Sequence, residues 1–228
     1  MNILITSGGT AEKIDNVRSI VNSSTGRLGC AIAEAFAVAA PAAQIFYVCG
    51  KSAVRPKSGV NIIEIEDVES LAHTVYQLLK ENTIDIIIHA MAVSDYRIKS
   101  ISAISNGEIL PMIIPKSGKI ASGYEEIVLH LERAPKIIGI MRLMAPKAII
   151  IGFKLLSNVP NETLIDVAHK LLMENGCNLV LANDTAEITE DTHKGYLINR
   201  LGQYSSHSTK AEIAKAIVTI VLKHGGGA

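Results

Sequence analysis

The sequence contains no tryptophan, and aromatic residues make up only 4% of its 228 residues. Lectins and RNA-binding proteins depend on aromatic side chains as stacking platforms, so both classes are disfavoured. Neither positive nor negative charge is in excess, because 22 basic residues balance 22 acidic residues. No nucleic acid or anionic membrane is therefore expected as the main partner, and small molecules are favoured.

Cysteine is scarce, and the three that occur lie far apart without metal-type spacing: Cys30, Cys49 and Cys177. This usage is typical of unpaired thiols in a reducing compartment. The first apolar run is too short for a signal peptide. The longest apolar region is interrupted by Glu34 and Pro41, so it cannot cross a bilayer at low cost. We expect a cytoplasmic protein with no membrane partner.

The sequence is rich in apolar residues, which make up 48% of it and can fill a sizeable core. Strands are predicted at residues 2–6, 44–49, 61–66, 85–93, 126–132, 148–155 and 178–184, and helices at 26–40, 67–82, 134–144, 161–176 and 209–224. Near-continuous apolar strands such as DIIIHAMAV indicate burial on both faces. We therefore predict one α/β domain, residues 1–228, built on a doubly wound, mostly parallel, Rossmann-like sheet.

Two segments break the alternation of strands and helices. The segment from Asp95 to Lys119 is too long for an ordinary connection, which predicts a mobile flap or a dimer arm. We place this flap at about residues 96–122. Near the end of the chain, GYLINRLGQYSS alternates apolar and polar residues around a turn, which predicts a C-terminal β-hairpin. Together the two segments suggest a homodimer with a partly shared site.

Polar residues gather where predicted strands end. Asp95, Lys154, Asn183 and Asp184 each follow or finish an apolar run. In open parallel sheets, ligands bind at the carboxyl ends of the strands. Asp95 could there bind a ligand hydroxyl or amine, or it could only cap the next segment.

Glycines in SGGT (residues 7–10) and TGRLG (residues 25–29) precede the first long helix. They would let backbone N–H groups approach a ligand, and the helix near Gly26 adds its positive dipole end, which favours phosphate. The structural alternative is that Gly8 and Gly9 only form a tight turn and Gly29 only lets the helix contact the sheet. A dinucleotide fingerprint is disfavoured, because 16 residues separate Gly9 from Gly26 where G-x-G-x-x-G forms one continuous turn.

Asn22 stands just before Ser24 and Thr25, either of which could cap the helix. The carboxamide of Asn22 offers two donors and one acceptor and could polarise a carbonyl beside a bound phosphate. It could equally form an Asx turn or brace the loop.

Five motifs occur in order along the chain: ITSGGTAEKIDNVRSIVNSSTGRLG, HAMAVSDYR, PKII, IGFKLL and LVLAND. Together they resemble the phosphopantothenate–cysteine ligase family, and DNVRSIVNSSTG is the most specific of them. The resemblance runs from Ile3 to the last helix. Because no flavoprotein decarboxylase sequence precedes it, the chain resembles the stand-alone bacterial form.

The resemblance implies a two-step ligation in coenzyme A biosynthesis. The carboxylate of 4'-phosphopantothenate attacks the α-phosphate of a nucleoside triphosphate, CTP in most bacterial members and ATP in animal ones, and pyrophosphate leaves. The amino group of cysteine then attacks the acyl-nucleotide, which gives 4'-phospho-N-pantothenoylcysteine and CMP or AMP. Mg²⁺ on the triphosphate would neutralise charge, and the sequence does not indicate its protein ligands.

The same resemblance implies roles for single residues. Catalysis is implied for Asn22, which would hold the acyl carbonyl, and for Lys119 of the flap, which would neutralise phosphate charge. Substrate binding is implied for Asn22, Ala92 and Asp95. Nucleotide binding is implied for Gly8, Gly9, Ser24, Gly26, Gly29, Asp95, Pro135, Lys136, Ile137, Ile138, Phe153, Lys170 and Asn183.

The chain departs from the family pattern at three points. Bacterial relatives commonly carry KIKK where this chain has KIAS, so Lys116 or Lys99 could act in place of the flap lysine named above. Relatives place two lysines four residues apart on the helix before AND, but here Lys170 is followed by Glu174. Lys136 replaces a family aspartate. The choice between CTP and ATP therefore stays open, with CTP favoured by the bacterial resemblance.

Two other functions stay open on the sequence. A nicotinamide-dependent reductase is favoured only by the doubly wound pattern and by Lys51 and Arg55 after the second strand. The chain could also be a non-catalytic nucleotide-binding protein of the same fold.

Overall fold

An eight-stranded sheet forms the centre of the fold, which is described here from a computed structural model that defines residues 1–112, 118–189 and 192–225. The strands lie in the order β13-β12-β11-β10-β6-β1-β4-β5. The six strands from β11 to β5 are parallel, and the β12–β13 hairpin extends the sheet antiparallel. The predicted sheet and C-terminal hairpin are thus confirmed. The bounds are β1 (Asn2–Ser7), β4 (Gln44–Gly50), β5 (Asn61–Ile65), β6 (Ile86–His89), β10 (Ile149–Leu156), β11 (Leu179–Asp184), β12 (Gly195–Asn199) and β13 (Tyr204–His207).

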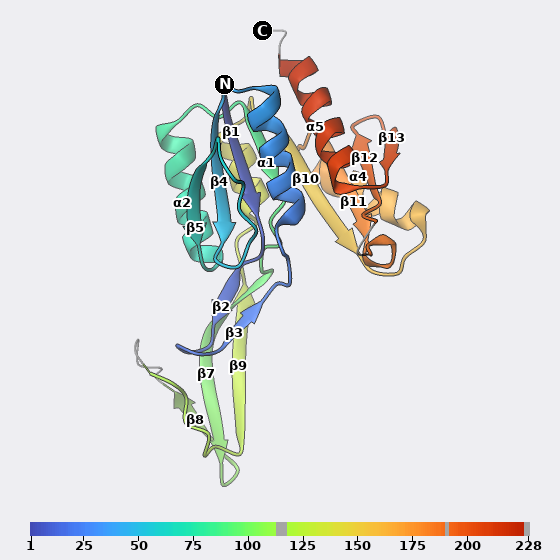
Figure 1. The fold of residues 1–228 in the computed structure, drawn as a ribbon. Coiled ribbons are helices and arrows are strands. Elements are labelled where there is room, and N and C mark those ends of the chain that lie inside the picture. Colours follow the sequence, from blue (N-terminus) through green and yellow to red (C-terminus); the bar gives the residue numbers. More distant parts are fainter. Residues whose placement is uncertain (113–117, 190–191, 226–228) are drawn as a thin grey trace.

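Helices cover both faces of this sheet (Figure 1). One face carries α1 (Arg27–Ala39) and α5 (Lys210–Gly225). The other carries α2 (Val68–Glu81), α3 (Ile137–Met144) and α4 (Asn161–Glu174). Successive side chains of a strand point to opposite faces, so Ile3 and Ile5 pack under α1 and α5 while Leu4 packs under the other helices. A short 3₁₀ helix, η1 (Thr185–Glu187), follows β11.

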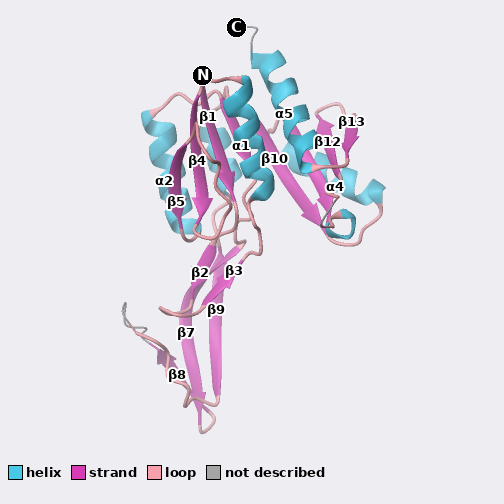
Figure 2. Cartoon of the chain, in the orientation of Figure 1, coloured by secondary structure: helices cyan, strands magenta, loops and turns pink. Residues whose placement is uncertain are grey.

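A separate antiparallel sheet extends from the carboxyl ends of the main strands, and Figure 2 shows it as a long projection. It consists of β7 (Tyr96–Ser105), β8 (Glu108–Met112) and β9 (Glu126–Arg133) in the order β8-β7-β9, and we call it the arm. The described part of the predicted flap is therefore largely strand. The strand predicted at residues 126–132 is present as β9, but it belongs to the arm, where it pairs with β7, and not to the main sheet. Residues 127–129 of β9 are apolar in succession, as in a strand of a buried sheet, yet all side chains of β9 are exposed or only partly buried.

A small hairpin and a buried carboxylate join the arm to the main sheet. The hairpin, β2 (Ala11–Lys13) and β3 (Ser19–Val21), was not predicted, because three-residue strands leave too short a pattern. Asp15 in its turn is buried and accepts hydrogen bonds from the Arg18 side chain and, at 3.0 Å, from the backbone N–H of Ile120. Arg18 also donates to the Ile120 carbonyl at 2.9 Å. These three residues, which we call the Asp15 clamp, fasten the returning arm segment to the early loop.

The three cysteines are buried and unpaired, as the sequence predicted. Across the part of the chain that the structure describes, no helix is long and apolar enough to span a membrane.

Candidate functional site

A cavity of about 400 Å³ opens at the carboxyl ends of β6, β10 and β11. Its wall also includes the loop before α1, the first turn of α1, the start of α3 and the first residue of α5. A larger cavity of about 680 Å³ lies between the β12–β13 hairpin and α5, at the amino ends of β10 and β11. None of the predicted site residues lines that larger cavity. The smaller cavity is the candidate site, because it stands where parallel sheets bind ligands and carries converging polar groups.

The structure brings most of the predicted site residues together around this cavity. Those that line it are Ser24, Gly26, Gly29, Ala92, Asp95, Pro135, Lys136, Ile137, Ile138, Phe153 and Asn183. They come from segments up to 159 residues apart (183 minus 24) in the sequence. Those that do not line it are Gly8, Gly9, Asn22, Lys119 and Lys170.

The first turn of α1 presents free backbone donors to the cavity. The helix begins after Gly26, whose φ of 70° lies in the left-handed region. No side chain caps it, so the idea that Ser24 or Thr25 is the cap was wrong. The Thr25 hydroxyl lies 3.5 Å from the backbone N of Arg27, at the outer limit of a hydrogen bond. The N–H groups of this turn are therefore available to an anion, and the helix dipole adds to the attraction.

Close approach explains the glycines beneath this turn. A Cβ on Gly29 would lie 2.3 Å from Ser7 Oγ, so only glycine lets α1 contact β1 here. A Cβ on Gly9 would lie 2.1 Å from the Asn22 carbonyl oxygen. The alternative that a glycine has only a structural role thus holds for Gly9, which does not line the cavity. Gly29 contacts β1 and also lines the cavity.

The Asn22 side chain lies beside the cavity wall and is held by distant partners. Its Nδ2 donates to the Ala92 carbonyl at 3.3 Å and to Ser94 Oγ at 3.2 Å. The backbone N–H of Asn22 donates to the Thr10 carbonyl at 3.2 Å. The Asx-turn alternative does not describe this side chain, because its nitrogen bonds with residues 70 and 72 positions away. These bonds do brace the loop before α1 against the segment after β6, as the other structural alternative predicts.

Asp95 and Lys136 form an ion pair at the rim of the cavity. Lys136 Nζ lies 2.5 Å from Asp95 Oδ1, and both side chains are largely exposed. Such a pair contributes little to stability, about 0–1 kcal/mol. The ion pair can therefore open at little cost, and each side chain can then pair with a charged group of a ligand. The segment after Asp95 is a strand, so this residue does not cap a helix.

His193 and Lys210 line the cavity, and the sequence analysis identified neither. Both ring nitrogens of His193 are buried and have no hydrogen-bond partner among the described residues. Burial, assisted by the positive charge of Lys210, lowers the pKa of His193 to about 4, so its ring is neutral at pH 7. Neither His193 nor Lys210 belongs to a sequence motif, so both are identified only by their positions in the fold.

The predicted phosphate-binding lysines lie away from the cavity wall. Lys170 is exposed on α4, with its Nζ 3.9 Å from the Glu174 carboxylate. Lys119 is exposed and adjoins the Asp15 clamp, and Lys99 is exposed on β7. Lys116 lies outside the described residues. In the described structure, the cations on the wall are instead Arg27, Lys136, Lys154 and Lys210.

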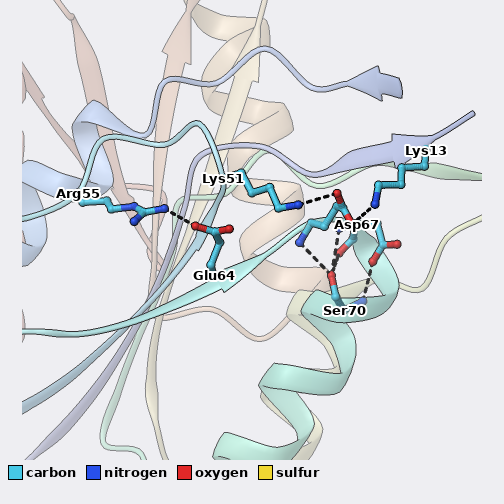
Figure 3. A network of polar contacts seen from close by, with 7 residues as sticks. Lys13, Lys51, Arg55, Glu64, Asp67 and Ser70 are labelled. Carbon is cyan, nitrogen blue, oxygen red and sulfur yellow. Dashed lines mark hydrogen bonds and ion pairs between the residues drawn. The ribbon is translucent and has the colours of Figure 1, made fainter. Parts of the chain in front are cut away.

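The basic residues that favoured a reductase are paired elsewhere, as Figure 3 shows. Lys51 Nζ lies 2.9 Å from Glu66, which also pairs with Lys13 at 2.7 Å, and Arg55 pairs with Glu64. The Glu66 carboxylate raises the pKa of Lys51. Neither Lys51 nor Arg55 lines the candidate site. A nicotinamide cofactor with a ribose phosphate thus finds no free cation at these two positions.

A doubly wound, mostly parallel sheet with helices on both faces defines the class of Rossmann-like α/β proteins, in which a helix terminus at the carboxyl edge commonly binds phosphate groups. Within that class, the family model described as the DNA/pantothenate metabolism flavoprotein C-terminal domain matches residues 1–224, and the chain belongs to this family.

Relatives agree with this assignment. The Coenzyme A biosynthesis bifunctional protein CoaBC of Thermococcus kodakarensis is 32% identical over 94% of this chain, which covers 49% of that protein. The chain thus spans about half the length of the curated relatives it matches. The crystal structure of the DNA/pantothenate metabolism flavoprotein from Streptococcus pneumoniae has a TM-score of 0.85 and 33% identity, covering 98% of this chain and 99% of that one. A Cab2 H337A mutant in complex with phosphopantothenate-cysteine shares the fold, with a TM-score of 0.72, 18% identity and coverage of 99% and 86%.

Proposed function

We propose that this chain is a phosphopantothenate–cysteine ligase, which joins 4'-phosphopantothenate to cysteine through an acyl-nucleotide. The observation that carries the proposal is the uncapped first turn of α1 at the mouth of the cavity, with the Asn22 side chain fixed beside it. Relatives named for coenzyme A biosynthesis, and a fold neighbour that binds phosphopantothenate-cysteine, support this choice of reaction.

Two nucleophilic displacements make up the proposed reaction. A carboxylate oxygen attacks the α-phosphorus of the nucleotide and pyrophosphate leaves. The amine nitrogen of cysteine then attacks the acyl carbon, and the bond from that carbon to the phosphate oxygen breaks. The first step turns a poor electrophile into a good one, because the nucleoside monophosphate is a stable leaving group.

The cavity suits these reactants in charge and polarity. The N–H groups of the α1 turn, with Arg27 and Lys210, provide an anion-binding end for the phosphates. Ile137, Ile138 and Phe153 provide an apolar wall for the base. We assign the pantothenate part to the wall that Ala92 and Asp95 line, and the Ala92 carbonyl accepts a hydrogen bond from Asn22.

Mg²⁺ fits this site as an ion that is bound mainly by the triphosphate. In the described chain, no three acidic, histidine or cysteine side chains are grouped to hold a metal, and Asp95 is the one carboxylate on the cavity wall. Mg²⁺ commonly binds through substrate phosphates and waters with one or two carboxylates. We propose Asp95 as the protein group nearest to such an ion. The ion would neutralise phosphate charge.

Release of pyrophosphate tests the proposed function. Purified protein with Mg²⁺, 4'-phosphopantothenate and cysteine is expected to release pyrophosphate with CTP and more slowly with ATP. Omitting 4'-phosphopantothenate should abolish the release. No release with either nucleotide contradicts the proposal, and tight CTP binding without turnover would identify a non-catalytic nucleotide-binding protein instead.

We also propose that the chain is a cytoplasmic homodimer joined through the arm. Large apolar side chains are exposed along the arm and its connections, which is unusual for a free surface: Tyr96, Ile109, Leu110, Tyr124, Ile127 and Leu131. A second copy that covered them would also bring its arm near the cavity mouth, because β7 begins directly after Asp95.

Light scattering checks the dimer. The mass in solution is expected to be twice 24.4 kDa. The double substitution Ile127→Glu and Leu131→Glu should give the single mass, because buried unpaired carboxylates cost several kcal/mol at an interface. Val38→Glu, at an 83% exposed position on α1, is the matched control and should leave the mass unchanged. A monomeric wild type would exclude the proposed assembly.

A further inference from the structure

His89, the last residue of β6, lines the candidate site with one edge of its ring. The side chain is partly exposed, although the three isoleucines before it are buried. Its Nδ1 lies 2.8 Å from Thr6 Oγ1 on the neighbouring strand β1. Its Nε2 has no hydrogen-bond partner among the described residues, and unlike the ring nitrogens of His193 it is not enclosed by protein atoms. Nε2 is therefore the nitrogen that a ligand in the cavity can reach.

The hydroxyl of Thr6 fixes which nitrogen of His89 carries the proton. Thr6 is fully buried, and within the described chain its hydroxyl has no partner other than His89 Nδ1. A hydroxyl has one hydrogen, and burying that hydrogen without an acceptor is costly. The hydroxyl therefore donates to Nδ1, which leaves the proton of the neutral ring on Nε2. Burial lowers the pKa of His89 to about 4, so at pH 7 the ring stays neutral and Nε2 presents one N–H donor.

This donor lies at the apolar wall of the cavity. Side chains alternate along β6, so His89 is on the same face of the sheet as Ile87, the face that α2, α3 and α4 cover. Gly152 of β10 is the register partner of His89. A Cβ on Gly152 would lie 3.2 Å from Ile138 Cδ1 and 3.2 Å from Leu171 Cδ2, so these two side chains extend over the strand beside His89. Helix α1, whose first turn we assign to the phosphates, covers the opposite face.

We propose that His89 is a specificity residue for the nucleotide, whose Nε2–H donates a hydrogen bond to an acceptor atom of the base, and that Thr6 is a positioning residue that holds the ring in this tautomer. The inference rests on the proposed ligase function and names how that site recognises its nucleotide. A neutral ring with a single donor beside apolar side chains suits a flat, uncharged base. The charged phosphates have the α1 turn, Arg27 and Lys210 instead.

The chemistry of cytosine fits this donor. Its ring carries two acceptors, N3 and O2, whereas its exocyclic amine only donates. A ring held as the Nε2–H tautomer cannot accept from that amine, so it selects the edge of the base that carries the acceptors. The hydroxyl of Thr6 thus determines, through the ring, which edge of the base is recognised.

Calorimetric titration with CTP and with inorganic tripolyphosphate tests the contact to the base. His89→Ala is expected to weaken CTP binding by about 3- to 10-fold, the range for one lost hydrogen bond. Tripolyphosphate has no base, so it should bind wild type and His89→Ala equally, which also shows that the variant folds. His89→Gln keeps an N–H donor near the position of Nε2 and should retain most of the CTP affinity. An equal loss for CTP and tripolyphosphate would overturn the proposal.

Two CTP analogues test the partner atom directly. 3-Deaza-CTP lacks N3, and 2-thio-CTP carries the weaker acceptor sulfur in place of O2. At least one of them should bind wild type more weakly than CTP and lose no further affinity in His89→Ala, because the hydrogen bond is already missing. If His89→Ala weakens CTP and both analogues by the same factor, His89 does not donate to the base.

Nitrogen-15 NMR of the imidazole ring tests the role of Thr6. In wild type without ligand at pH 7, Nε2 should carry the proton and Nδ1 should not. Thr6→Val should give a mixture of the two tautomers and weaken CTP binding by about 2- to 3-fold, whereas Thr6→Ser should behave as wild type. In the His89→Ala background, Thr6→Val should not weaken CTP binding further. A proton on Nδ1 in wild type, or additive losses, would overturn the positioning role.

The failure of this inference and the failure of the ligase function give different results. If wild type binds CTP and releases pyrophosphate but His89→Ala binds CTP normally, the ligase function stands and His89 does not read the base. If wild type binds no nucleotide, the proposed function fails and the inference falls with it.

Discussion

Replacing Gly29 by alanine is expected to abolish nucleotide binding and to lower the free energy of unfolding by about 1–3 kcal/mol, the usual range for an overpacked site. The added Cβ would lie 2.3 Å from Ser7 Oγ and 2.7 Å from Ser7 Cβ. Ser7 belongs to β1, which is hydrogen-bonded on both sides and cannot move away. Helix α1 must therefore move, and its first turn carries the N–H groups that face the cavity.

Gly139→Ala is the matched control for this substitution. Gly139 is also near the start of a helix, but a Cβ there would meet nothing within 4 Å. Alanine is the better helix former by about 1 kcal/mol, so this variant should be as stable as wild type or more stable. Thermal unfolding measures stability, and titration with CTP measures binding. Normal CTP affinity in Gly29→Ala would show that the α1 turn does not hold the phosphates.

The main sheet could be predicted from the sequence because burial on both faces leaves a strong pattern. Residues 86–88 of β6 are three isoleucines in a row, and all are buried. The arm was harder to assign, because β9 carries apolar residues at a similar density yet belongs to a sheet with exposed faces. Its pairing with β7 depends on residues 22 to 37 positions away, which no local pattern encodes.

The site could be predicted where backbone geometry demands a particular residue or where a strand ends. Gly26, Gly29 and Asn183 are of this kind, and each lines the cavity. His193 could not be found, because an isolated histidine between strands has no periodicity, and it is held by residues distant in sequence, among them Ser208, whose carbonyl accepts from its backbone N–H. Lys170 was placed by analogy alone, and the helix turns it towards solvent.

The second large effect is expected from Asp15→Asn, which should loosen the arm segment around Lys119. The carboxylate of Asp15 accepts from the Arg18 side chain and from the backbone of Val17, Arg18 and Ile120. The Arg18 hydrogen bonds, followed by those from the backbone, hold the pKa of Asp15 well below its usual range. An asparagine has one acceptor oxygen and turns an N–H group towards one of these donors, so the clamp loses at least one contact.

Hydrogen exchange at the Ile120 amide measures this loosening. The exchange rate at pH 7 is expected to rise by about tenfold or more in Asp15→Asn, because this N–H donates to the carboxylate. Asp85→Asn is the matched control: its carboxylate also accepts from a backbone N–H, that of Asn2, but far from the arm. That variant should leave exchange at Ile120 unchanged. If Lys119 neutralises phosphate charge, as the family resemblance implies, the first chemical step should also slow in Asp15→Asn.

The pH dependence of the clamp follows from the sign of the Asp15 shift. A carboxyl whose pKa falls on folding stabilises the folded state once the unfolded chain is ionised, above pH about 4. This contribution is lost as the pH falls below 4 towards the lowered pKa of the folded state. Wild type should therefore lose stability on acidification more steeply than Asp15→Asn, whose side chain does not titrate. Parallel unfolding curves for the two proteins between pH 5 and pH 3 would mean that the carboxylate of Asp15 does not hold the arm.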